Sequence, residues 1–134
     1  MKNYTDIDQS KELAKILPIV SADMWYSHYG HPGYNSVITY NEEQWFLCQI
    51  RNSYHDDIPC WSLAALLNIL PKEYYPIKDH KTDLILGKPK DKWCVLYWDT
   101  TGMQHGEETL GDNPIDACVD MIIKLKESNL LKLK

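Results

Sequence analysis

Pro59-Cys60-Trp61-Ser62-Leu63-Ala64-Ala65-Leu66-Leu67-Asn68-Ile69-Leu70, followed by Pro71, is the stretch that decides the fold. Proline suits the first position of a helix, and alanine and leucine are strong helix formers. Only Ser62 and Asn68 are polar, and a helix that is apolar nearly all round is buried on most sides. The sequence therefore predicts a helix over 59–70 in the core of the protein.

Two further helices are predicted, one near each end of the chain. The first runs over 6–17, with Thr5 as its N-cap and Pro18 ending it. The second begins at Asn113-Pro114, where asparagine suits the N-cap and proline the first helical position. Apolar residues follow it at helical spacing, namely Ile115, Cys118, Val119, Ile122 and Leu125.

Aromatic and β-branched residues between turn formers predict the strands. These strands lie at 24–26, 37–40, 45–51, 82–86, 93–99 and 107–110. In 93–99 apolar side chains alternate onto both faces, which predicts a strand covered on both sides. Helices at both ends and in the middle, around such strands, describe an α+β fold. We expect one compact domain over residues 1–134, with a small, mainly antiparallel sheet packed with the buried central helix.

Composition narrows the classes of function. The 134 residues suit one domain, and 14 basic against 19 acidic residues give a formal net charge of −5. Arg51 is the only arginine, so a basic surface for nucleic acid is not indicated. The longest uncharged apolar run, Ile58 to Leu70, is too short for a membrane span, and the N-terminus lacks the apolar core of a signal peptide. We expect a cytoplasmic protein that binds neither membranes nor nucleic acid. No phosphate-binding or dinucleotide-binding motif is present, and no cofactor is expected.

Cys60 is the one candidate nucleophile. At the N-terminus of the predicted helix its thiolate would be stabilised, as in papain-like enzymes. His105 is the candidate base downstream, with His80 as an alternative. This arrangement describes a small cysteine hydrolase. The alternative is that Cys48, Cys60, Cys94 and Cys118 are reduced core thiols, since free cysteine is among the most buried residue types.

His28 and His31 are candidate metal ligands, together with the acidic His55-Asp56-Asp57 segment. The spacing of the two histidines falls in a predicted loop around Gly30 and Gly33, where such spacings arise freely. Polar loop residues are the simpler interpretation, and no metal is expected.

Trp25, Tyr26, Tyr29 and Tyr34 gather within ten residues and are the candidates for binding a partner. Tyrosine and tryptophan offer large, stiff contact areas with a polar tip, which protein interfaces favour. The alternative is that these residues belong to a sheet whose paired residues happen to be aromatic.

The segments P-x-W-S-L-x-A-L-L, here Pro59 to Leu67, and N-P-x-D-A-C, here Asn113 to Cys118, together resemble a signature of small uncharacterised proteins from phages and mobile elements of gut bacteria. In that pattern a small residue such as alanine often takes the position of Cys60, which argues against an indispensable thiol. The resemblance implies no activity. Since no strong catalytic motif is present either, we expect a non-enzymatic accessory protein that binds a partner, most simply another protein. A homodimer remains open.

Overall fold

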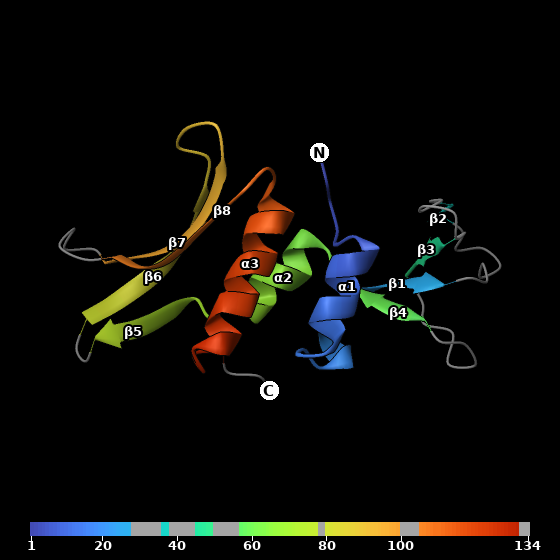
Figure 1. The fold of residues 1–134 in the computed structure, drawn as a ribbon, viewed down its shortest axis with the longest axis horizontal. Coiled ribbons are helices and arrows are strands. Elements are labelled where there is room, and N and C mark those ends of the chain that lie inside the picture. The colour runs from blue at the N-terminus through green and yellow to red at the C-terminus, as the bar shows by residue number, and fades with distance from the viewer. Residues whose placement is uncertain (28–35, 38–44, 50–56, 78–79, 100–104, 132–134) are drawn as a thin grey trace. The chain divides into compact units, whose positions relative to one another are not determined.

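The structure is a computed structural model and describes residues 1–27, 36–37, 45–49, 57–77, 80–99 and 105–131 (Figure 1). The backbone contacts divide the chain into two compact units. We call Tyr4–Ala65 the N-terminal unit, and Leu66–Lys134 together with Met1–Asn3 the C-terminal unit. The expectation of a single domain over residues 1–134 stays a prediction.

The N-terminal unit contains a four-stranded antiparallel sheet in the order β2-β3-β1-β4. Its strands are β1 (Met24–Ser27), β2 (Ser36–Val37), β3 (Phe46–Cys48) and β4 (Ile58–Cys60). Helix α1 (Ile7–Ala14) and a short 3₁₀ turn, η1 (Ile19–Ser21), precede them. The core of this unit is formed by Ile7, Tyr26, Trp45, Leu47 and Cys60. The aromatic strand predicted at 24–26 is therefore confirmed as the inner strand β1.

Helix α1 begins one residue later than predicted, at Ile7, and its N-cap is Asp6. Asp6 accepts a 2.8 Å hydrogen bond from the Gln9 backbone amide, and the Gln9 side chain accepts one from the Asp6 amide, which makes a reciprocal capping box. The prediction that Thr5 caps this helix is wrong. The Thr5 hydroxyl instead accepts a hydrogen bond from the backbone amide of Trp61.

The predicted central helix is shorter than expected. Helix α2 covers Leu63–Ile69, and the preceding residues Ile58–Cys60 form β4, so the prediction that the helix begins at Pro59 is wrong. These residues pair with β1, with Cys60 opposite Met24. Ser62 caps the helix, because its hydroxyl accepts a hydrogen bond from the Ala65 amide.

The C-terminal unit contains a second antiparallel sheet, a meander in the order β5-β6-β7-β8. Its strands are β5 (Glu73–Ile77), β6 (His80–Gly87), β7 (Trp93–Asp99) and β8 (His105–Gly111), and α3 (Pro114–Glu127) follows them. The strands predicted at 82–86, 93–99 and 107–110 are confirmed, whereas β5 is not predicted. The α+β class is confirmed, with two antiparallel sheets where the sequence predicts one.

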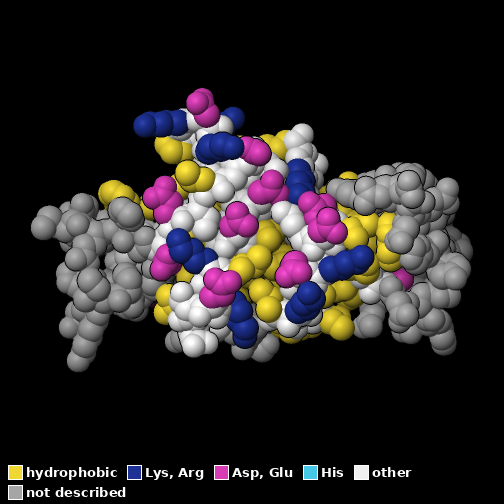
Figure 2. Space-filling view, in the orientation of Figure 1, with side chains coloured by type: hydrophobic (Ala, Val, Ile, Leu, Met, Phe, Trp, Pro, Cys, Tyr) yellow, Lys and Arg dark blue, Asp and Glu magenta, His cyan; other side chains and the backbone are white. Residues whose placement is uncertain are grey.

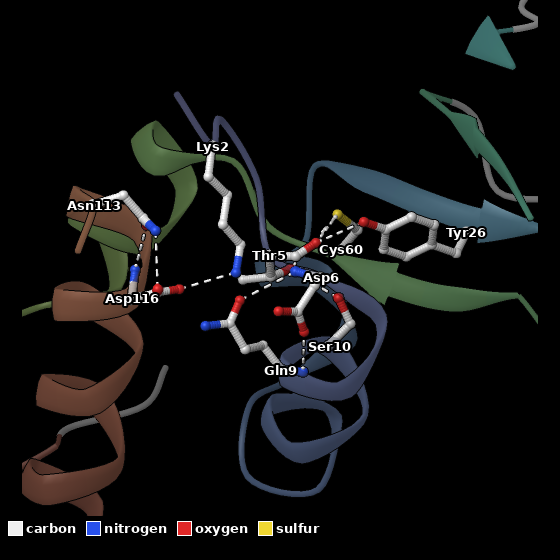
Figure 3. Close-up of polar contacts among 9 residues, drawn as sticks. All are labelled: Lys2, Thr5, Asp6, Gln9, Ser10, Tyr26, Cys60, Asn113 and Asp116. Carbon is white, nitrogen blue, oxygen red and sulfur yellow. Dashed lines mark hydrogen bonds and ion pairs between the residues drawn. The ribbon is translucent and has the colours of Figure 1, made fainter. Parts of the chain in front are cut away.

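Helix α3 begins as the sequence predicts. The Asn113 side chain accepts a 2.9 Å hydrogen bond from the Asp116 amide, and Pro114 occupies the first helical position. Lys2 forms a 2.9 Å ion pair with Asp116 in the first turn (Figure 3). The apolar side of the helix, including Ile115, Cys118, Ile122 and Leu125, is fully buried.

Candidate functional site

The candidate nucleophile Cys60 lies in a buried polar cluster with Thr5, Ser10 and Tyr26 (Figure 3). The Cys60 sulfur is 3.6 Å from the Thr5 hydroxyl and 3.5 Å from the Thr5 carbonyl oxygen, which accepts from the thiol. The Tyr26 hydroxyl donates a 2.7 Å hydrogen bond to that same carbonyl, and the Ser10 hydroxyl lies 2.8 Å from the Thr5 hydroxyl. All four side chains are inaccessible to solvent. The cluster joins the segment before α1 to β1 and β4.

The surroundings of Cys60 keep its thiol protonated. Burial raises the pKa of Cys60 to about 11. Hydrogen bonds with Thr5, Tyr26 and Ser10 lower this pKa, but by less than burial raises it. The negative charge of Asp23 also raises it. The residue also lies in strand β4, so its predicted position at a helix N-terminus is wrong. A nucleophilic cysteine needs a stabilised, accessible thiolate, and this site provides neither.

The tryptophan and serine that follow Cys60 also have structural roles. The buried Trp61 indole donates a 3.0 Å hydrogen bond to the Ser21 hydroxyl, which in turn donates to the carbonyl of Pro18. The Ser62 backbone amide donates to Asp23, and its hydroxyl donates to the same carboxylate. Trp61 therefore holds η1 in place, and Ser62 holds Asp23, the residue that precedes β1.

The remaining predicted site residues divide into three groups. Trp25 and Tyr26 are buried in β1, which does not favour a direct contact with a partner, and their role in binding stays a prediction. His28, His31, Tyr29 and Tyr34 lie outside the described residues. His105 is the first residue of β8, and the surroundings of its side chain are likewise not described. Within the described ranges, no three His, Cys, Asp or Glu side chains gather closely enough to hold a metal ion.

A different feature lies on the sheet of the C-terminal unit, whose two faces differ. Val95 and Tyr97 on β7 are fully buried and share their face with Thr109 of β8, the register partner of Val95. The Thr109 hydroxyl donates a 2.7 Å hydrogen bond to the Ala117 carbonyl of α3. Helix α3 therefore covers this face.

The opposite face is what we call the open face. Direct register partners point to the same side of a sheet, so Ile85 of β6 and Leu96 of β7 share it, and so do Cys94 and Leu110. Ile85 is 42% exposed, Trp98 40% and Leu110 54%. Cys94 is buried among them. The open face thus consists of Ile85, Leu96, Trp98 and Leu110, with Cys94 beneath them and the carboxylates of Asp83 and Glu108 beside them.

The sequence did not reveal this face as open. The alternation of Trp93–Asp99 predicts cover on both sides, and that prediction is wrong for the side of Leu96 and Trp98. An apolar side chain carries the same sequence signal whether it packs within its own chain or stays exposed. The six apolar positions of β7 therefore could not show which face is left open.

Acidic groups border the open face. Asp83 lies directly opposite Trp98, and Glu108 directly opposite Leu96. The Cys94 thiol donates to the Glu108 carboxylate at 3.6 Å, and burial, together with this carboxylate, raises the pKa of Cys94. Lys81 forms ion pairs of 3.0 Å with Glu73 and 3.6 Å with Asp83.

Figure 2 shows the side of the molecule that faces the viewer in Figure 1. Among the described residues drawn there, acidic and basic side chains are interspersed. In the described part of the chain, no helix is both long and apolar enough to cross a bilayer. Comparison of the sequence and structure with protein families, curated proteins and solved structures finds no match.

Proposed function

We propose that the protein is a non-enzymatic accessory protein of a phage or mobile element, and that it acts by binding another protein through the open face. The first half of this proposal rests on the resemblance of the two sequence motifs. The second half rests on the exposed side chains of β6, β7 and β8.

One observation carries the binding role. An antiparallel sheet with one face on the core presents polar residues on its other face. Here that outer face instead presents Ile85, Trp98 and Leu110, each at least 40% exposed and on three adjacent strands. Contiguous exposed apolar side chains with a polar rim are typical of protein interaction sites, and tryptophan is enriched at their centres.

The non-enzymatic half of the proposal is supported by the state of the candidate nucleophile. Cys60 is inaccessible, its pKa is raised to about 11, and its hydrogen bonds hold backbone segments together. A cysteine hydrolase would need the opposite properties. The alternative hydrolase function therefore has no support from the cluster.

Site-specific photo-crosslinking tests the binding role. A photoreactive amino acid replaces Leu110 or Ile85 in the full chain, which is expressed in the organism that naturally makes it. Val20, which is 87% exposed in η1, is the matched control position. We expect the same protein to cross-link from positions 110 and 85, and not from position 20. Cross-links that are equal from all three positions, or missing from 110 and 85, would overturn the proposal.

A further inference from the structure

We infer that the partner's docking segment is basic, with lysine or arginine side chains flanking an apolar one. This inference rests on the proposed function, because it concerns the same open face. It follows from where the charges of the C-terminal sheet lie.

Among the described residues, the charged groups that surround the apolar side chains of the open face are mainly acidic. Glu73, Lys81, Asp83 and Glu108 all project from this face, as their register with Trp98 and Leu96 requires. Among the side chains of this face that the structure describes, three carboxylates and one ammonium leave an excess of two negative charges. Lys81 lies 3.0 Å from Glu73 and 3.6 Å from Asp83, so its ammonium is shared between these carboxylates.

Asp83 is placed to meet a cation beside the apolar side chains of the open face. Trp98 and Asp83 are direct register partners on β7 and β6, and the Asp83 side chain is 45% exposed. A guanidinium or ammonium can donate hydrogen bonds to such a part-exposed carboxylate. Glu108, beside Leu96, offers a second carboxylate on the next strand. A cation at each side of an apolar anchor would therefore meet complementary groups.

The same charges argue against the other occupants. Nucleic acid and anionic lipid would bring further negative charge to a face that already carries an excess of it. A second copy of the chain would bring its own acidic face against this one, and like charges at an interface are unfavourable. A basic segment of another protein is the occupant whose charge is complementary.

Two synthetic peptides of equal length test the inference, one alternating leucine with arginine and the other leucine with glutamate. Each is titrated into the full-length, ¹⁵N-labelled protein. We expect the arginine peptide to shift the backbone amides of β6, β7 and β8 and to bind at least about ten-fold more tightly than the glutamate peptide. Added salt should weaken its binding.

Charge-neutral variants identify the groups responsible. Asp83→Asn combined with Glu108→Gln should remove most of the preference for the arginine peptide, whereas Asp8→Asn, at an exposed acid in α1, should leave it unchanged. Asp83→Asn and Glu108→Gln keep the size of the side chain, so the sheet should fold normally.

The outcomes separate the inference from the proposed function. Equal or tighter binding of the glutamate peptide at the open face overturns the basic partner and leaves protein binding intact. Amide shifts that lie outside β6, β7 and β8 overturn the inference, and so does the absence of shifts with either peptide. The cross-linking from position 110 then tests the binding role independently. Concentration-dependent broadening of open-face resonances without peptide would identify a second copy as the occupant and also overturn it.

Discussion

Ile85 of β6 lies directly opposite Leu96 of β7, and both side chains project from the sheet face that α3 does not cover. The next residue along β7, Val95, points the other way and is fully buried. One strand thus contributes both to the core of the C-terminal unit and to its open face. Substitutions in β7 can therefore distinguish side chains that stabilise the fold from side chains available for binding a partner.

Neighbouring substitutions in β7 should have different effects on stability. Val95→Ala removes two buried methyl groups and leaves a cavity, so we expect a loss of about 2–3 kcal/mol in the free energy of unfolding. Leu96→Ala, on the open face, should cost about 1 kcal/mol or less. Urea unfolding followed by circular dichroism measures both. Equal losses would show that the open face is packed in solution.

Two glycines of the C-terminal sheet form a second matched pair. A Cβ at Gly111 would lie 2.7 Å from the backbone nitrogen of Ala117, at the start of α3, whereas nothing lies within 4 Å of a Cβ at Gly87. Gly111→Ala should therefore destabilise the protein by about 1–3 kcal/mol, because strand or helix must shift. Gly87→Ala should stay within about 0.5 kcal/mol of the wild type. Thermal unfolding of the two variants checks this, and a neutral Gly111→Ala would contradict the close approach.

The polar cluster of the N-terminal unit should depend on Tyr26. Tyr26→Phe removes the hydrogen bond to the Thr5 carbonyl in a fully buried site, and we expect a loss of about 1–3 kcal/mol in unfolding free energy. Tyr4→Phe is the control, since this half-buried tyrosine has no hydroxyl hydrogen bond among the described contacts. If chemical denaturation gives both variants the same stability, the cluster does not hold the segment before α1 in place.

Stability should fall at alkaline pH because of the buried thiols. Burial raises the pKa of Cys60 to about 11 and that of Cys118 to about 12, whereas an unfolded thiol has a pKa of about 8.5. The folded state holds these protons more tightly than the unfolded state does. The stabilisation of the fold by the protonated thiols is therefore complete below about pH 8.5, and it is lost as the pH rises towards the pKa values of the folded state. The free energy of unfolding should fall by at most about 1.4 kcal/mol per pH unit for each thiol.

Urea unfolding at a series of pH values between about 8 and 10.5 measures this slope. The Cys60→Ala variant is the control, because it lacks one of the buried thiols and should show a shallower slope than the wild type. A slope unchanged by Cys60→Ala would show that the Cys60 pKa is not raised.

Local signals predicted the C-terminal unit well. The Asn113 cap, Pro114 and the apolar spacing of α3 lie within a few residues of one another, and each favours the same helix. Strand β7 was also evident, because its side chains alternate over its whole length. Strand β5 was missed, since it contains Pro76, which usually argues against a strand.

The start of the central helix could not be predicted from local signals. Pro59 fits the first position of a helix and also a position in an edge strand, and pairing with β1 decides between them. That pairing joins Met24 to Cys60 across more than thirty residues. The helix N-terminus expected at Cys60, and with it the candidate catalytic site, depended on this non-local choice.

The central claim is that the open face binds a protein partner. The most direct test is isothermal titration calorimetry of this protein with the partner that cross-links from position 110. Leu110 is more than half exposed, so Leu110→Ser should leave the fold intact, and Val20→Ser is the matched exposed control. We predict that Leu110→Ser weakens binding at least about ten-fold, through the loss of apolar area from the interface, and that Val20→Ser leaves the affinity unchanged. Equal affinity of Leu110→Ser and the wild type would contradict the claim.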